Sequence, residues 1–208
     1  MSYPADPNRL LAAGYVQSGS NTYLGAFLST NGGTSWTQVK IANESGSTAR
    51  AAAIAPSNVK TIYAAGHTSS WAPLLFRSTD NGVNWSQIAA PSSSSQILSL
   101  AIHPASPNTL IVTTSWGGTF KSIDGGGSWT KLEKAPLEAN CVVWNPSNPN
   151  EIFVGSREGV FYSADGGATW TDLSAGLAAK NVVGIEIDGP GRMVYVGIFS
   201  GGICRRSF

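Results

Sequence analysis

Charged residues are scarce in this chain. Among its 208 residues, 13 are Lys or Arg and 12 are Asp or Glu, which is 12% in total, whereas an average globular domain has about 25%. The net charge is only +1, and no basic run exceeds two residues. Binding to nucleic acid or to an anionic membrane surface depends on clustered cations. The composition therefore argues against a nucleic-acid partner.

Long apolar runs, thiols and histidines are also few. No stretch of about 18 apolar residues is present, so no membrane insertion is expected. The first eight residues lack the charged and apolar regions of a signal peptide, so none is expected in this chain. Cys141 and Cys204 are the only cysteines; one bridge is possible, but two buried free thiols are the favoured interpretation. With only two histidines, no metal site or other cofactor is expected.

Turn-forming residues and apolar residues are abundant. The chain has 24 glycines and 11 prolines, and 42% of its residues are hydrophobic. No segment places apolar residues at helical spacing over three turns, whereas short β-branched and aromatic runs alternate with turn signals. The sequence therefore predicts an all-β protein with almost no helix.

One ten-residue phrase occurs four times. The copies are Phe27-Leu-Ser-Thr-Asn-Gly-Gly-Thr-Ser-Trp36, Phe76-Arg-Ser-Thr-Asp-Asn-Gly-Val-Asn-Trp85, Phe120-Lys-Ser-Ile-Asp-Gly-Gly-Gly-Ser-Trp129 and Phe161-Tyr-Ser-Ala-Asp-Gly-Gly-Ala-Thr-Trp170. The first serines lie 49, 44 and 41 residues apart. A period near 40–45 residues with strand-like flanks is typical of propeller blades. A Pro- and Asn-rich turn lies upstream of each phrase, at 3–8, 55–58, 103–108 and 145–150.

These repeats predict a β-propeller with about five four-stranded repeats, called blades, whose strands we name A to D. The first blade is expected to lack strand A. The fifth is expected to have strands only at 182–188, 194–197 and 202–205, with Arg206 where the phrase requires Ser. We expect residues 1–208 to form a single domain that lacks N-terminal strands or blades of a larger parent. Unpaired strand edges promote association, so we expect homodimerisation, strand exchange or an open gap beside the first and fifth blades.

The phrase resembles the Asp-box (bacterial neuraminidase, BNR) repeat, and the resemblance covers nearly the whole chain. The combination of Asn-Pro-Ser-Asn-Pro-Asn150 with Gly159-Val-Phe-Tyr-Ser-Ala-Asp-Gly-Gly-Ala-Thr-Trp170 is most similar to xyloglucanase-type glycoside hydrolases and uncharacterised relatives. Sortilin-like receptors, sialidases and a photosystem assembly factor share the box. The resemblance implies an extracellular or periplasmic location. It also implies that the boxes are structural turns on the face opposite the functional site.

Each box position has an expected structural role. Ser and Asp oxygens accept hydrogen bonds inside the C–D turn, glycines allow positive φ there, and the Trp buries its ring. The structural box residues are Ser29, Asn31, Trp36, Ser78, Asp80, Trp85, Ser122, Asp124, Trp129, Ser163, Asp165 and Trp170. We therefore assign none of them to catalysis.

The remaining loops, between strands B and C and between D and the next A, carry the candidate binding residues. These are Tyr23, His67, Trp71, Trp116, Arg157 and Glu158. Trp71 and Trp116 occupy corresponding loops, where an indole face can stack on a sugar ring while polar neighbours bind hydroxyls. The alternative is that both rings pack between blades.

Glycoside hydrolysis usually requires two carboxyl groups about 5–9.5 Å apart. Outside the boxes, Glu44, Glu133, Glu138 and Glu158 fall in the candidate loops, and none recurs in a motif. The sequence therefore favours a non-catalytic module that binds a glycan or a protein partner. Two alternatives remain: a fragment of a xyloglucanase-like hydrolase whose catalytic residues lie partly outside this chain, and a structural scaffold or assembly factor.

Overall fold

The computed structural model describes residues 2–3, 6–91, 95–188, 190 and 192–208. Pro4 and Ala5 of the first predicted turn lie outside the described residues. Nineteen strands, arranged in five antiparallel sheets, make up the secondary structure of the described chain, and no helix occurs in it. The prediction of an all-β protein is confirmed.

Each sheet is one blade and follows the chain order of its strands. The first blade contains β1 (Ser2–Tyr3), β2 (Asp6–Ser18), β3 (Asn21–Ser29) and β4 (Thr37–Lys40). The second contains β5 (Thr48–Ile54), β6 (Ile62–His67), β7 (Pro73–Ser78) and β8 (Ser86–Gln87). The third contains β9 (Ile97–Ile102), β10 (Leu110–Thr114), β11 (Gly118–Ser122) and β12 (Thr130–Lys131). The fourth contains β13 (Ala139–Asn145), β14 (Asn148–Ser156), β15 (Gly159–Ser163) and β16 (Thr171–Asp172), and the fifth β17 (Val182–Asp188), β18 (Met193–Ile198) and β19 (Gly202–Ser207).

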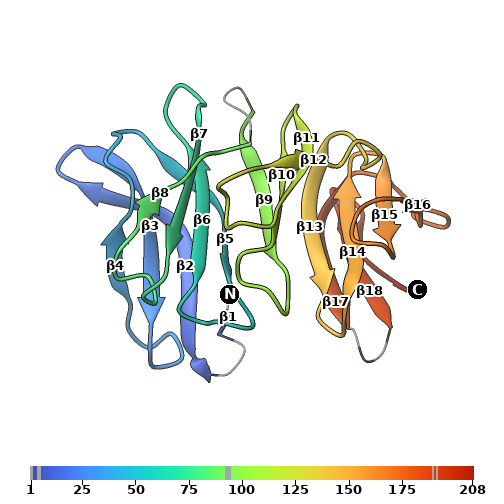
Figure 1. Cartoon of the computed structure of the whole chain (residues 1–208), viewed down its shortest axis with the longest axis horizontal. Coiled ribbons are helices and arrows are strands. Elements are labelled where there is room, and N and C mark those ends of the chain that lie inside the picture. The colour runs from blue at the N-terminus through green and yellow to red at the C-terminus, as the bar shows by residue number, and fades with distance from the viewer. Residues whose placement is uncertain (1, 4–5, 92–94, 189, 191) are drawn as a thin grey trace.

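The blades pack face to face along an arc. Strand A of each of the last four blades contacts strand A of the next, in the order β5, β9, β13 and β17. In the first blade β2 contacts β5, because β1 is too short to cover it. The first and fifth blades lie toward opposite ends of the longest axis of the molecule (Figure 1). This radial stacking of four-stranded sheets is the arrangement of a β-propeller.

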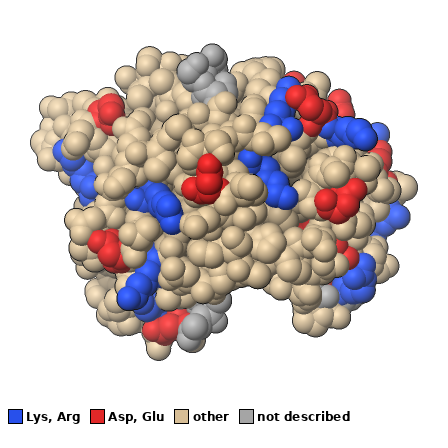
Figure 2. Space-filling model, viewed as in Figure 1, with Lys and Arg blue, Asp and Glu red and all other residues tan. Residues whose placement is uncertain are grey.

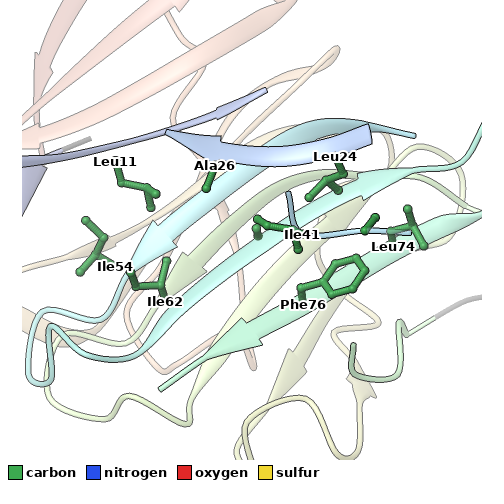
Figure 3. Packing of buried hydrophobic residues seen from close by; sticks show 10 residues of the cluster. Leu11, Leu24, Ala26, Ile41, Ile54, Ile62, Leu74 and Phe76 are labelled. Atoms are coloured by element: carbon green, nitrogen blue, oxygen red, sulfur yellow. The ribbon is translucent and has the colours of Figure 1, made fainter. Parts of the chain in front are cut away.

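The core is divided among the blade interfaces. Figure 3 shows the cluster between the first two blades, where Leu11 and Leu24 face Ile62 and Phe76. Similar clusters lie between the second and third, third and fourth, and fourth and fifth blades. Because both faces of an internal blade are covered, all six residues of β6 are buried. This is why the B strands read as continuous apolar runs rather than as alternating ones.

The strands of the fifth blade agree with the prediction, whereas those of the first blade do not. The fifth blade has three strands as predicted, and Arg206 pairs with Val194 just as the box residue Ser163 pairs with Ile152. The first blade was expected to lack strand A, but β1 pairs with β2 in that position. β1 has two residues, where strand A of the second blade, β5, has seven.

The two cysteines are free, as predicted, but they are only partly buried. Cys141 lies on β13 and Cys204 on β19, both at the interface of the fourth and fifth blades. The burial of Cys141 raises the pKa of its thiol to about 12. The prediction of two buried thiols is therefore corrected to two partly buried ones; for Cys204 the reason is that β19 is the outermost strand of its sheet in the described part of the chain.

Candidate functional site

Because consecutive strands of a blade are antiparallel, successive turns lie at opposite ends of the strands. The B–C turns and the D–A connections lie at one end, which we call the loop end, and the A–B turns and the boxes lie at the other, the box end. In Figure 1 the β6–β7 turn marks the loop end along the upper edge of the molecule. The box and candidate binding residues are therefore on opposite ends.

Box side chains are engaged within their own turns. In the third blade, the Ser122 hydroxyl donates to Asp124 Oδ1 at 2.8 Å and accepts from the Gly126 N–H at 2.8 Å. Asp124 Oδ1 also accepts from the Ser128 N–H at 2.9 Å. The second and fourth boxes repeat these bonds, and in the first box Asn31 Oδ1 accepts from Ser29 at 3.0 Å. In each box, hydrogen bonds from the Ser and the Asp or Asn side chains therefore stabilise the turn between strands C and D.

Hydrogen bonding shifts the titration of the box carboxylates. The Ser128 hydroxyl and N–H, followed by the Ser122 hydroxyl, hold the pKa of Asp124 far below its ordinary value. Thr169 and Ser163 do the same for the pKa of Asp165, and Asn84 and Ser78 for that of Asp80. A carboxylate that accepts several hydrogen bonds favours its charged form. These groups are poor proton donors or acceptors near neutral pH.

The box tryptophans are less buried than the sequence predicts. Trp85, Trp129 and Trp170 are half-buried and pack against the preceding blade, as Trp170 does with Leu132. Trp36 is 42% exposed because the first blade has no preceding blade in this chain to cover it. Box tryptophans therefore act as contacts between blades rather than as central core residues.

A cavity of about 680 Å³ lies along the inner strands of blades two to five. It is lined by segments of β5, β9, β13 and β17, together with Pro56, Pro104 and Pro146 of the A–B turns. Most lining side chains are Ala, Val, Ile or Leu, and Glu186 is the one carboxylate among the described lining residues. The cavity therefore offers a largely neutral, apolar wall.

A β-bulge occurs at the same place in each of these inner strands. The register of strands A and B skips one residue near the loop end of each of the four blades. The skipped residues are Arg50, Leu98, Asn140 and Val183. Bulges re-aim side chains and are frequent beside binding sites. All four residues line a second cleft of about 330 Å³, together with Arg157 and Asn181. We call these six residues the bulge rim.

The bulge rim carries polar groups with defined partners. The Asn140 side-chain amide donates to Val182 O at 2.8 Å and to Asn181 Oδ1 at 3.2 Å. Arg157 Nη1 lies 3.4 Å from Glu138 Oε2. The cleft is therefore lined by the guanidinium groups of Arg50 and Arg157 and the amide groups of Asn140 and Asn181. The carboxylate of Glu138 lies beside Arg157.

Of the six predicted binding residues, Arg157 alone lines a described pocket of the loop end. Trp116 lies in the β10–β11 turn and is 74% exposed, and Glu158 is exposed in the β14–β15 turn. Tyr23 lies on β3 beneath Lys40 Nζ, which is 4.1 Å from its ring centre. Tyr23, Trp116 and Glu158 thus belong to the first, third and fourth blades and do not form one cluster in the described part of the chain.

His67 and Trp71 do meet, in the loop that follows β6. Their ring centres lie 4.5 Å apart, and Trp71 is 56% exposed with φ of 67°. His67 is buried, its Nδ1 lies 2.9 Å from Thr68 O, and its Nε2 has no partner. A positive φ at a bulky residue is strained. The indole therefore packs against a buried imidazole while more than half of the Trp71 surface is exposed to solvent.

Sequence reasoning missed Arg50, Asn140 and Asn181. Arg50 stands alone among alanines, and Asn140 begins an apolar strand; neither recurs as a motif. The signal that could have found them is positional, because strand A of every blade faces the propeller axis. The bulges themselves could not be predicted, because the four bulge residues share no residue type.

Two carboxylates of the loop end lie beside cationic side chains. Glu138 binds Arg157, and Glu133 lies 3.8 Å from Lys131 Nζ. No cluster of three or more metal-ligating side chains occurs among the described residues. Nor does that part of the chain hold a helix long and apolar enough to cross a bilayer.

Comparisons with known proteins agree with this geometry. The BNR/Asp-box repeat matches residues 161–172, which form the fourth box and its flanking strands. The chain has the β-propeller fold, and its fourth box matches the BNR/Asp-box repeat. No curated protein matches the sequence of this propeller.

Three solved structures show the same fold as the propeller. The GH74 xyloglucanase from Xanthomonas campestris has a TM-score of 0.74 at 18% identity, over 94% of this chain and 32% of that one. The GH74 enzyme from Niastella koreensis has a TM-score of 0.71 at 17% identity, over 93% and 35%. YCF48 from Cyanidioschyzon merolae has a TM-score of 0.59 at 16% identity, over 90% and 63%. The propeller spans about a third of the two GH74 chains.

Proposed function

We propose that this propeller is a non-catalytic binding module that holds a glycan or a protein segment at its loop end. The observation that carries the proposal is the bulge repeated in four successive inner strands, which brings the bulge rim to the mouth of the central cavity. Each of these four bulges interrupts the regular pairing of strands A and B in its blade. Such an interruption is expected where side chains must be re-aimed toward a ligand.

The chemistry of the bulge rim suits an extended polar ligand. Arg50 and Arg157 supply planar donors, Asn140 and Asn181 supply amide groups, and Leu98 and Val183 supply apolar contact. Exposed Trp71 and Trp116 extend the loop end with flat apolar faces. Sugar rings and peptide groups both match this mixture.

Binding is favoured over catalysis because of the carboxylates. Glu186 is the one carboxylate in the described lining of the central cavity, and Glu138 is neutralised by Arg157. The fold shared with the GH74 enzymes supports the alternative of a hydrolase fragment, and the fold shared with YCF48 supports the alternative of a scaffold. An extracellular or periplasmic location also belongs to the proposal.

The test is calorimetric titration of the full chain with xyloglucan oligosaccharides and, separately, with an unstructured peptide library. Arg50→Ala/Asn140→Ala removes the rim groups, and Trp71→Ala/Trp116→Ala removes the exposed indoles. Ile123→Ala is the control, because Ile123 is an exposed apolar residue of the third box, at the end opposite the loop end. We expect either double variant to weaken binding at least tenfold while Ile123→Ala leaves it unchanged.

Two results would contradict the proposal. Binding that survives both double variants would place the ligand elsewhere. Release of reducing sugar from xyloglucan by this chain would instead support the hydrolase alternative.

A further inference from the structure

Three hydroxyl groups lie in a row across the third blade. Thr113 on β10 pairs with Ser99 on β9 and with Thr119 on β11. Residues that pair directly across antiparallel strands point to the same face of a sheet. Ile111, two residues before Thr113, belongs to the cluster between the third and fourth blades. The three side chains, which we call the hydroxyl row, therefore face the fourth blade.

Neighbouring blades have no hydroxyl group in this row. The strand register gives the equivalent residues, which are Ala51, Ala65 and Leu75 in the second blade and Cys141, Gly155 and Val160 in the fourth. Blades of the same fold are therefore built with apolar or small residues at this level. The hydroxyl row is a departure from the repeat that the propeller fold does not require.

Two hydroxyl groups of the row are buried without a partner. Thr113 is 0% exposed and Thr119 is 1% exposed, and neither Oγ1 forms a hydrogen bond within the described chain. The hydroxyl group of Ser115, two residues after Thr113, is likewise buried and unpaired. By contrast, the Thr114 hydroxyl donates to Gly118 O at 2.9 Å. Burying an unpaired hydroxyl group is unfavourable, so the row requires a partner.

The interface has room for a small partner beside the row. The residue of the fourth blade at this level is Ala139, which is fully buried. Its equivalent in the third blade is Ile97, because each pairs with the last residue of strand B in its own blade. Ile97 packs with Ala65 and Leu75 of the second blade. Ala139 and the two threonines have fewer non-hydrogen side-chain atoms than those three residues. A polar site with spare room meets both conditions for an internal water molecule.

The hydroxyl row begins at the central cavity. Ser99 lines that cavity, and its Oγ accepts from the Val142 N–H at 3.3 Å, across the interface of the third and fourth blades. From Ser99 the row continues one strand at a time, through Thr113 to Thr119, away from the cavity. Water in the cavity therefore has a polar route into the interface.

We propose that the hydroxyl row is an internal water site, in which a water molecule bridges Thr113 Oγ1 and Thr119 Oγ1. A water molecule suits these groups because it can donate to one hydroxyl oxygen and accept from the other hydroxyl group. Further water joins this molecule to the central cavity past Ser99. The site holds the third and fourth blades together through hydrogen bonds, where the second and third blades use apolar contact. It does not depend on the binding role proposed for the bulge rim.

The direct test is nuclear magnetic resonance on the full chain with isotopically labelled threonine methyl groups. Rotating-frame magnetisation transfer from water to a methyl group reports a water molecule that stays beside it. We expect cross-peaks for Thr113 and Thr119. Thr119→Val should abolish the cross-peak of Thr113, and Thr113→Val that of Thr119, because the bridging water needs both hydroxyl groups. Transfer relayed by the residue's own hydroxyl proton would survive the change in its partner.

Thr114→Val is the matched control. It removes a neighbouring threonine hydroxyl on the same strand, but that group has its partners within the protein, Gly118 O and the Gly117 N–H. Because Thr114 alternates with Thr113 along β10, its side chain points to the other face of the sheet. We expect Thr114→Val to leave both cross-peaks in place.

Stability gives an independent result with a definite sign. Valine has the shape of threonine without the hydroxyl group. With the bridging water, Thr113→Val and Thr119→Val each break a hydrogen bond, so each should lower the urea midpoint and raise the unfolding equilibrium constant about fivefold. The double variant should be little worse than either single variant, because both changes remove the same bridge. Without water, removing an unpaired buried hydroxyl group would raise the midpoint.

Three outcomes would overturn the proposal: no cross-peaks in the unmodified chain, cross-peaks that do not respond to the change in the partner, or an unchanged or raised urea midpoint for either valine variant. No ligand enters these measurements, so their result is separate from that of the titrations at the bulge rim.

Discussion

Replacing a box serine tests whether the boxes hold the blades together. Ser122 is 1% exposed, and its hydroxyl bridges Asp124 Oδ1 and the Gly126 N–H, both at 2.8 Å. In Ser122→Ala the buried Gly126 N–H loses its acceptor. An unpaired buried donor costs about 1–3 kcal/mol, so we expect the free energy of unfolding to fall by that amount. Urea denaturation followed by circular dichroism and tryptophan fluorescence measures the change.

Ser29→Ala is the matched comparison. Ser29 makes the same two contacts, but its hydroxyl donates to the neutral amide oxygen of Asn31 at 3.0 Å. Hydrogen bonds to charged groups are stronger than neutral ones, so Ser29→Ala should destabilise less. The depressed pKa of Asp124 means that its contribution is present above the unfolded-state pKa and is lost as pH falls. Equal losses for the two variants at neutral pH, or a negligible loss for Ser122→Ala, would refute this account.

Three further predictions concern other parts of the chain. In Gly66→Ala the added Cβ would lie 1.9 Å from Thr48 O, so we expect the free energy of unfolding, measured by urea titration, to fall by about 2 kcal/mol or more. In the control Gly184→Ala the added Cβ has no atom within 4 Å, so the free energy of unfolding should be almost unchanged. Burial raises the pKa of Glu151, but hydrogen bonds from Asn145 and Tyr162 and the charge of Arg192 outweigh it and leave the pKa lowered. Stability should therefore fall as pH drops below the unfolded-state value near 4, and Glu151→Gln should flatten that pH dependence. At pH 8 a thiol reagent should modify Cys204 well before Cys141; similar rates measured by mass spectrometry would contradict the assigned burial.

The sequence was sufficient for features that repeat. The box spacing located five blades, and the alignment of Arg206 with the box serines is confirmed by its pairing with Val194. The repeat also aligns His103 with Asn145, each followed by Pro in the turn between strands A and B. His103 Nδ1 accepts from the Ala105 N–H at 3.1 Å, just as Asn145 Oδ1 accepts from the Ser147 N–H at 2.9 Å. Repetition works because a local turn has the same backbone requirements in each blade.

The sequence was insufficient where the property depends on a neighbouring blade. Trp36 and Trp170 occupy the same box position, yet Trp36 is 42% exposed, whereas Trp170 packs against the cluster between the third and fourth blades. The bulge residues Arg50 and Asn140 form a common rim only through the stacking of separate sheets. Neither the burial of a box tryptophan nor the position of a bulge is encoded in a short motif.

Departures from the repeat are therefore the most informative positions in this propeller. Where the box is complete, its Ser forms hydrogen bonds inside the turn and its Phe packs at the interface between blades. Where Cys204 and Arg206 replace them, an apolar cavity of about 310 Å³ lies beside β19. At the loop end, Arg50 and Asn140 stand at bulges that are equivalent to those of the aliphatic residues Leu98 and Val183. The fold does not require a polar residue at these bulges, and this is why the proposed binding role is assigned to Arg50 and Asn140.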